Sequence, residues 1–166
     1  DDNFAIVIAD VSGKGIPAAL YMMKAQALIK NIAKSNIDVA DVFYKVNNEL
    51  CEGNDSCMFV TAFMAVINIT NGDVRCVNAG HIPPLVFDGF EYSSLKTHKN
   101  IVLGIRKNIK FVSEKFNLFP NNSIFLYTDG VTEAENSSSK FFGEKGLFKA
   151  LQKSKSNPSG NLNTFL

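Results

Sequence analysis

The dipeptide Asn71-Gly72 constrains the fold of this chain more than any other short stretch. It lies between two apolar runs, residues 59–67 and 74–78. Asn-Gly between such runs is the strongest short signal for a β-hairpin, because its tight turn needs residues that tolerate positive φ. The sequence therefore predicts that at least part of the core is built on antiparallel sheet.

Other segments add strands and helices to this hairpin. The further strand-like or extended segments are 4–9, 84–87, 101–104, 110–118 and 123–128, of which 4–9 and 123–128 are predicted to be buried. Helices are predicted over 18–34, from an N-cap at Asp38 or Asp41 to about residue 51, and over 143–155, while 158–166 is predicted as loop or short helix. Helices combined with antiparallel strands predict an α+β fold.

Composition limits the function classes. The 166 residues suit one domain, and 17 basic against 16 acidic residues give no electrostatic case for binding nucleic acid or an anionic membrane. No signal peptide is evident, and no apolar run is long enough to span a bilayer. The three cysteines fit no zinc-ligand spacing, so we expect them to be reduced, small buried side chains in a cytoplasmic protein.

Two aspartates stand at equivalent places in the sequence. Asp10 follows the run 4–9, Asp129 follows the run 123–128, and glycines come soon after each. Two such carboxylates on adjacent strands would form a hard, oxygen-rich site of the kind that Mg²⁺ and Mn²⁺ prefer. Taken alone, either acid is better explained as the cap of a turn or helix.

The strings around these acids resemble the signatures of the bacterial SpoIIE/RsbU-type phosphatases, which are metal-dependent protein phosphatases (PPM, also called type 2C). The similar strings occur in the family's order and are ADVSGKGIPAAL (9–20), FVTAF (59–63), VNAGHIPPL (77–85), LGI (103–105), LYTDGVTEA (126–134) and FGE (142–144). The resemblance runs from about residue 6 to residue 147. An ordered set is far more specific than any single string.

The resemblance implies a fold, a metal site and a reaction. The fold is a four-layer αββα sandwich, in which helix pairs flank a central antiparallel β-sandwich. Asp10 matches the aspartate that bridges two divalent cations, Mn²⁺ or Mg²⁺, Val11 the position that offers a backbone carbonyl, and Asp129 the aspartate of the Asp-Gly motif that holds one metal. A metal-activated water would attack phosphorus directly, so Asp10 and Asp129 are also the candidate catalytic residues.

Other residues near these motifs are weaker candidates. Lys14 and the amides near Gly13, at the start of a predicted helix, could meet a substrate phosphate, as could Gly130. A solvated turn lysine explains Lys14 equally well. His81 could be a base or a metal ligand, but the ligand set implied by the resemblance is all oxygen, which favours a structural role for this histidine.

The sequence departs from the family at both ends. An upstream Gly-Gly-Asp-type motif and a late Asp-Asp-x-Thr string are both missing between residues 1 and 166. We therefore expect residues 1–166 to form a single but partial phosphatase domain, truncated at both ends. The metal site would then be incomplete, and the activity of these residues alone is an open question.

The resemblance also suggests partners. The implied substrate is phosphoserine or phosphothreonine on a regulatory protein, typically a STAS-type anti-sigma-factor antagonist in a partner-switching pathway, and a sensor or regulatory domain could be attached. A non-catalytic pseudophosphatase that binds a phosphoprotein is the alternative. An unrelated metal-dependent hydrolase of small phosphate esters is a third.

Overall fold

The computed structural model describes residues 2–35 and 38–155, so the predicted element at 158–166 lies outside the described residues. The chain divides into two compact units. Unit 1 comprises residues 1–83 and 96–120, and unit 2 comprises residues 84–95 and 121–166.

Unit 1 is built on a four-stranded antiparallel sheet. Its strands are β1 (Asn3–Val11), β2 (Val60–Asn68), β3 (Asp73–Ala79) and β6 (Glu114–Asn117), in the order β1-β2-β3-β6. The predicted hairpin is confirmed, because β2 pairs with β3 across the turn at Asn71-Gly72. Gly72 has φ +76°, and a Cβ at this position would lie 2.1 Å from the Leu118 carbonyl oxygen, so only glycine fits.

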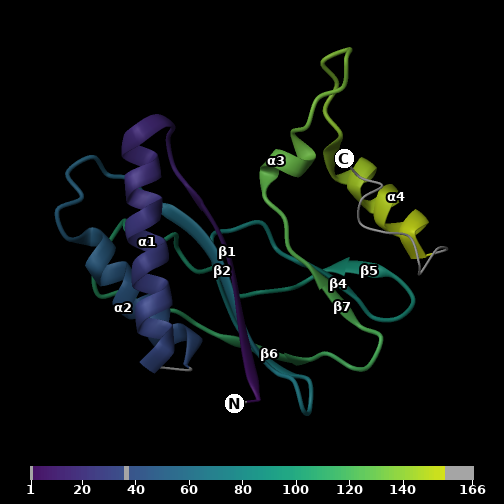
Figure 1. Ribbon diagram of the computed structural model, residues 1–166, viewed down its shortest axis with the longest axis horizontal. Helices are drawn as coiled ribbons and strands as arrows, with labels where there is room; N and C mark the ends of the chain where they lie inside the picture. The colour runs from purple at the N-terminus through teal and green to yellow at the C-terminus, as the bar shows by residue number, and fades with distance from the viewer. Residues whose placement is uncertain (1, 36–37, 156–166) are drawn as a thin grey trace. The chain divides into compact units, whose positions relative to one another are not determined.

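Two helices cover one face of this sheet. α1 (Gly15–Ser35) and α2 (Val39–Cys51) lie along β1 and β2 (Figure 1). Alternate residues of β2 point toward them, as the two-residue period of a strand requires. The core that results consists of Ala25, Ile29, Val39, Val42, Phe43, Val46, Leu50, Val60, Ala62, Met64, Val77, Ala79, Leu103 and Phe111.

The start of α2 resolves a choice that the sequence left open. Asp38 is the N-cap, and its Oδ1 accepts hydrogen bonds from the backbone N–H groups of Ala40 at 2.9 Å and Asp41 at 3.1 Å. Asp41 lies inside the first turn and pairs with Lys45. Asp38 therefore satisfies amides that would otherwise lack a partner in the helix.

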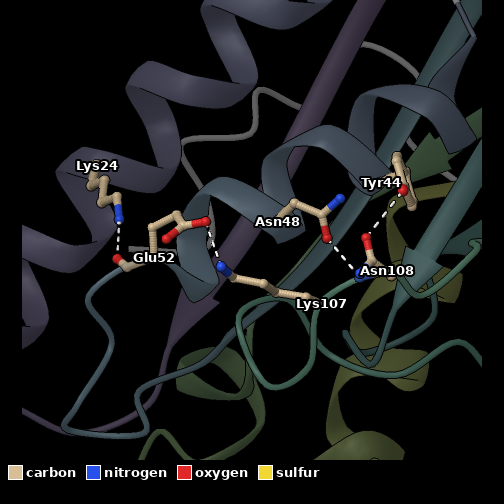
Figure 2. Close-up of polar contacts among 6 residues, drawn as sticks. All are labelled: Lys24, Tyr44, Asn48, Glu52, Lys107 and Asn108. Atoms are coloured by element: carbon tan, nitrogen blue, oxygen red, sulfur yellow. Dashed lines mark hydrogen bonds and ion pairs between the residues drawn. The ribbon is translucent and has the colours of Figure 1, made fainter.

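The segment between β5 and β6 is tied to α2 by polar contacts. Figure 2 shows Asn108, whose backbone N–H donates to Asn48 Oδ1 at 2.7 Å and whose own Oδ1 accepts from the Tyr44 hydroxyl at 3.3 Å. Lys107 forms an ion pair with Glu52 beyond the C-terminal end of the same helix. These contacts hold the segment after the Leu-Gly-Ile string against the helix layer.

Two strand predictions need correction. The run 4–9 does form a strand, but β1 is an edge of the sheet, and Phe4 is 57% and Val7 41% exposed, so the prediction of a buried strand is wrong. The run 123–128 contributes only a short strand, β7 (Ser123–Phe125), and Ser123 is exposed. A continuous apolar run predicts a strand, but it does not show whether that strand pairs with a neighbour on one side or on both.

The cysteine prediction is also only partly right. Cys76 is buried, and burial raises the pKa of its thiol to about 12, so it behaves as a small apolar side chain. Cys57 is exposed, and Cys51 is partly exposed. The expectation that all three cysteines are buried is therefore wrong for Cys57.

Unit 2 contains a smaller antiparallel sheet and two helices. Its strands are β4 (Leu85–Phe87), β5 (Tyr92–Ser94) and β7, in the order β5-β4-β7, and they are followed by α3 (Asp129–Thr132) and α4 (Gly143–Lys155). A turn at Asp88-Gly89 joins β4 to β5, and α4 has the predicted bounds. Among the described residues, no helix has both the length and the apolar character needed to cross a membrane.

Candidate functional site

Asp10 is the penultimate residue of β1, within the strand rather than after it. Its neighbours Ala9 and Val11 pack against the helix-side core, so the Asp10 side chain belongs to the opposite face of the sheet. The side chain is exposed, and its Oδ1 accepts a hydrogen bond from the Val11 backbone N–H at 2.9 Å. The second carboxylate oxygen, Oδ2, remains available as a donor to a cation.

The turn after β1 is tied to Phe59 by two hydrogen bonds and contains two glycines with positive φ. Ser12 exchanges two bonds with Phe59: its N–H donates to the Phe59 carbonyl at 2.9 Å, and its Oγ accepts from the Phe59 N–H at 2.9 Å. Gly13 and Gly15 have φ values of +85° and +79°, and no atom lies within 4 Å of a Cβ built on either. Glycine is thus required by the backbone conformation, and the space beside the turn stays empty.

Lys14 lies between these glycines and is exposed. Among the described residues it takes part in no hydrogen bond or ion pair, so its ammonium group is solvated. α1 begins at Gly15, one residue later. A helix start beside an unpaired lysine is compatible with an anionic group, and this geometry equally fits the solvated turn lysine that the sequence allowed.

Hydrogen bonds connect Thr61, which pairs with Asp10, to His81 and Asn78. Thr61 is the residue of β2 directly opposite Asp10, and its Oγ1 lies 2.9 Å from His81 Nδ1. The His81 backbone N–H donates to Asn78 Oδ1 at 2.8 Å, and Asn78 Nδ2 donates back to the His81 carbonyl at 3.0 Å. His81 is 6% exposed, which agrees with the structural role favoured from the sequence.

Asp129 and Gly130 belong to unit 2. Asp129 is the first residue of α3, and its carbonyl accepts from the Glu133 N–H at 2.7 Å and from Thr132 Oγ1 at 3.0 Å. Its carboxylate is exposed at the helix start, where a negative charge is favourable. β1, which carries Asp10, and β7, which precedes Asp129, belong to different sheets, so the two aspartates do not lie at neighbouring strands of one sheet.

The donors present suit a hard cation but are few. Asp10 and Asp129 offer carboxylate oxygens, and Val11 adds a backbone carbonyl, which is the ligand chemistry of Mg²⁺ and Mn²⁺. Across residues 2–35 and 38–155, no three His, Cys, Asp or Glu side chains are grouped in a way that could hold a metal ion. Each aspartate therefore fits as one contributor to an oxygen site.

Comparison with known proteins decides the family. The family described as Stage II sporulation protein E (SpoIIE) matches residues 1–166, the full length of the sequence. The chain belongs to the SpoIIE family. The resemblance seen in the ordered motifs is thereby confirmed.

Two curated relatives carry the comparison further. The chain is 33% identical over 138 residues to the phosphoserine phosphatase RsbU of Bacillus subtilis (strain 168), with 80% of this chain and 40% of RsbU covered. It is 29% identical over 178 residues to protein IcfG of Synechocystis sp. (strain ATCC 27184 / PCC 6803 / Kazusa), with 91% of this chain and 28% of IcfG covered. The chain thus spans well under half the length of these relatives.

Solved structures of similar proteins show the fold. The RsbU and RsbW domains of Rv1364c from Mycobacterium tuberculosis match with a TM-score of 0.78 and 21% identity, covering 96% of this chain and 44% of that one. The SiaA-PP2C domain of Pseudomonas aeruginosa matches with a TM-score of 0.76 and 21% identity, covering 91% and 61%. These matches confirm the predicted α+β fold of the PPM type.

Proposed function

We propose that the protein carrying this chain hydrolyses phosphoserine or phosphothreonine on a regulatory protein in a metal-dependent reaction. The observation that carries the proposal is membership of the SpoIIE family over residues 1–166. The similarity to RsbU, a phosphoserine phosphatase, supports the choice of reaction. We further propose that residues 1–166 act as one phosphatase domain, and that the reaction takes place in the cytoplasm.

The aspartates of the two strongest motifs take the metal-binding roles in this proposal. Asp10, the Val11 carbonyl and Asp129 would hold divalent cations, Mn²⁺ or Mg²⁺, with two ions in the complete site. Such ions lower the pKa of bound water and stabilise the attacking and leaving oxygens of phosphoryl transfer. Each of the two carboxylates is exposed within its own unit and is therefore accessible to a cation.

The turns beside the aspartates take the substrate-binding roles. The Lys14 ammonium group and the backbone near Gly13 would meet phosphate oxygens, because a solvated cation next to a helix start favours an anion. Gly130, which follows Asp129 in the first turn of α3, would let the chain approach the substrate closely. We propose a STAS-type anti-sigma-factor antagonist as the phosphoprotein and partner switching as the pathway.

Substitution of the two aspartates tests the proposal. In the full-length gene product, Mn²⁺ should support hydrolysis of p-nitrophenyl phosphate and of a phosphorylated STAS-type protein. Asp10→Asn and Asp129→Asn should each lower the rate by orders of magnitude, because the amide carries no charge to hold the cation. Asp55→Asn, at another exposed acid, is the matched control and should leave the rate unchanged.

Two outcomes would contradict the proposal. Full activity in both the Asp10→Asn and the Asp129→Asn variants would remove the metal-binding assignment. A wild-type protein that binds the phosphoprotein but never hydrolyses it with Mn²⁺ or Mg²⁺ would favour the non-catalytic regulator. Preference for small phosphate esters over every phosphoprotein would favour the unrelated hydrolase.

A further inference from the structure

Asp10 and Thr61 are direct partners in the antiparallel pairing of β1 and β2. Side chains of direct partners lie on the same face of a sheet, with Cβ atoms about 4.5–5.5 Å apart. Thr61 Oγ1 lies 3.4 Å from the Asp10 carbonyl oxygen and 2.9 Å from His81 Nδ1. One hydroxyl therefore links a buried histidine to the main chain of the candidate metal ligand.

The hydroxyl has a single hydrogen, and this fixes the direction of the chain of bonds. A carbonyl oxygen can only accept, so the Thr61 hydroxyl donates its hydrogen to Asp10. The remaining contact of Thr61 Oγ1 must then be an accepted one, which requires His81 Nδ1 to carry a hydrogen. If both contacts of Thr61 Oγ1 are hydrogen bonds, His81 carries its hydrogen on Nδ1.

The same chain of bonds reaches the carboxylate of Asp10. The peptide that joins Asp10 to Val11 accepts from Thr61 at its carbonyl and donates from its N–H to Asp10 Oδ1 at 2.9 Å. A bond that fixes the plane of this peptide also restrains the carboxylate. The same bond also restrains the orientation of the backbone that leads into Val11.

The backbone around His81 is fixed by hydrogen bonds and close packing. Its backbone exchanges two hydrogen bonds with Asn78, whose carbonyl accepts from Asn100 Nδ2 at 3.1 Å. The preceding Gly80 has φ +71°, and a Cβ there would lie 2.5 Å from Val102 Cγ1. The ring therefore starts from a backbone that has little freedom to move.

We propose that His81 and Thr61 are positioning residues for the Asp10 carboxylate, with His81 Nδ1–H donating to Thr61 and Thr61 donating to the Asp10 carbonyl. This inference rests on the proposed function for its metal-binding consequence. Removing a residue that hydrogen-bonds to a metal ligand typically lowers the metal affinity by about 10- to 100-fold.

Matched substitutions test the positioning role in the full-length gene product. Thr61→Val removes the hydroxyl at nearly constant shape, and Thr61→Ser keeps it. His81→Phe removes the donor, and His81→Asn keeps an N–H on the atom bonded to Cγ, where Nδ1 stands. Thr61→Val and His81→Phe should weaken Mn²⁺ binding by about 10- to 100-fold, while Thr61→Ser and His81→Asn stay close to the wild type.

Two NMR measurements need no metal. The ¹⁵N shifts of His81 should report a hydrogen on Nδ1 in the metal-free protein. The Val11 amide should lose order in Thr61→Val and His81→Phe and retain it in Thr61→Ser and His81→Asn, while circular dichroism shows that all four variants are folded. A hydrogen on Nε2 alone, or unchanged Val11 order in Thr61→Val, would overturn the proposal.

These readouts separate the two proposals. A wild-type protein without Mn²⁺ affinity would overturn the proposed function, together with the metal-binding consequence drawn from it. The tautomer of His81 and the order of the Val11 amide would still decide whether the two side chains position Asp10. Thr61→Val keeps the methyl group and Thr61→Ser keeps the hydroxyl, so an equal loss of Mn²⁺ affinity in the two variants would show that the hydroxyl does not account for the loss and would contradict its role.

Discussion

At the scale of single residues, Asn47 shows how one buried amide shapes a motif far away in the sequence. It is fully buried on α2, its Nδ2 donates to the Arg106 carbonyl at 2.7 Å, and its Oδ1 accepts from the Gly104 N–H at 2.9 Å. Gly104 has φ +92°, and a Cβ there would lie 2.4 Å from the Tyr21 hydroxyl. The Leu-Gly-Ile string is therefore a site of close packing against α1 and α2.

Replacing Asn47 by alanine should be costly. The change leaves the buried Gly104 N–H and the part-buried Arg106 carbonyl without their partner, and an unpaired buried group costs about 1–3 kcal/mol, so the free energy of unfolding should fall by roughly 2–4 kcal/mol. Urea unfolding followed by circular dichroism measures this loss. The neighbouring Asn48→Ala removes only the exposed bond to the Asn108 N–H and should cost about 1 kcal/mol or less. Equal losses in the two variants would contradict the interpretation.

Sequence reasoning found the string around Gly104 but not its partner Asn47, and it found Asp10 but not Thr61. Both missed residues carry a visible signal, since each is a polar residue within an otherwise apolar pattern. Asn47 follows Val46 on the buried side of α2, and Thr61 interrupts the run 59–67. What the sequence lacks is the identity of the partner, because pairings across 57 and 51 residues depend on strand register and loop path.

At the scale of elements, the beginning of α2 is fixed by one side chain. Asp38 accepts two bonds from backbone amides of the first turn, and Asp41 makes an exposed i,i+4 ion pair with Lys45 at 2.8 Å. An N-cap bond satisfies a group that the helix itself cannot satisfy, whereas an exposed ion pair competes with water. The two aspartates should therefore contribute unequally to the stability of the helix.

Substitutions at these two positions measure that inequality. Asp38→Ala should lower the free energy of unfolding by about 1 kcal/mol, and Asp38→Asn should change it little, because asparagine caps as well as aspartate. Asp41→Ala should cost only about 0.3–0.5 kcal/mol. Urea midpoints at constant m-value provide the comparison. A larger loss in Asp41→Ala than in Asp38→Ala would show that Asp38 is not the operative cap.

The elements themselves were largely predictable, and their environments were not. Local signals located the hairpin at Asn71-Gly72 and the bounds of α4, and they narrowed the cap of α2 to Asp38 or Asp41, because each depends on residues close together in the chain. The exposure of β1 and the shortness of β7 depend on which neighbours pair with each strand. An apolar run carries no information about a missing neighbour, which explains why both were predicted to be buried.

At the scale of the whole molecule, the sequence predicted the α+β class from the mixture of hairpin and helix signals, and the order of the motifs identified the family. The division into sheets was not predictable. β4 pairs with β7 although β5 and β6 lie between them in the sequence, so β7, the strand that precedes Asp129, belongs to a different sheet from β1, which carries Asp10. Pairing between distant segments is decided by the packing of the whole chain, and local patterns do not encode it.

A ligand that binds only the folded protein stabilises the whole molecule, so cation binding has a global readout. The stabilisation equals RT ln(1 + [L]/Kd), which is about 2.7 kcal/mol when Mn²⁺ is present at 100 times its Kd. The unfolding temperature of the full-length gene product should therefore rise with Mn²⁺ concentration, and EDTA should reverse the rise. Differential scanning calorimetry across a Mn²⁺ series measures both effects.

The aspartate variants decide whether this stabilisation comes from the proposed site. Asp10→Asn and Asp129→Asn should each shift the rise to much higher Mn²⁺ concentrations, because each variant replaces a charged donor oxygen of the site by a neutral amide. Asp55→Asn removes the same charge from another exposed position and should respond as the wild type does. An equal rise in all four proteins would mean that Mn²⁺ stabilises through general charge screening or another site, and Asp10 and Asp129 would then lose their assignment as ligands.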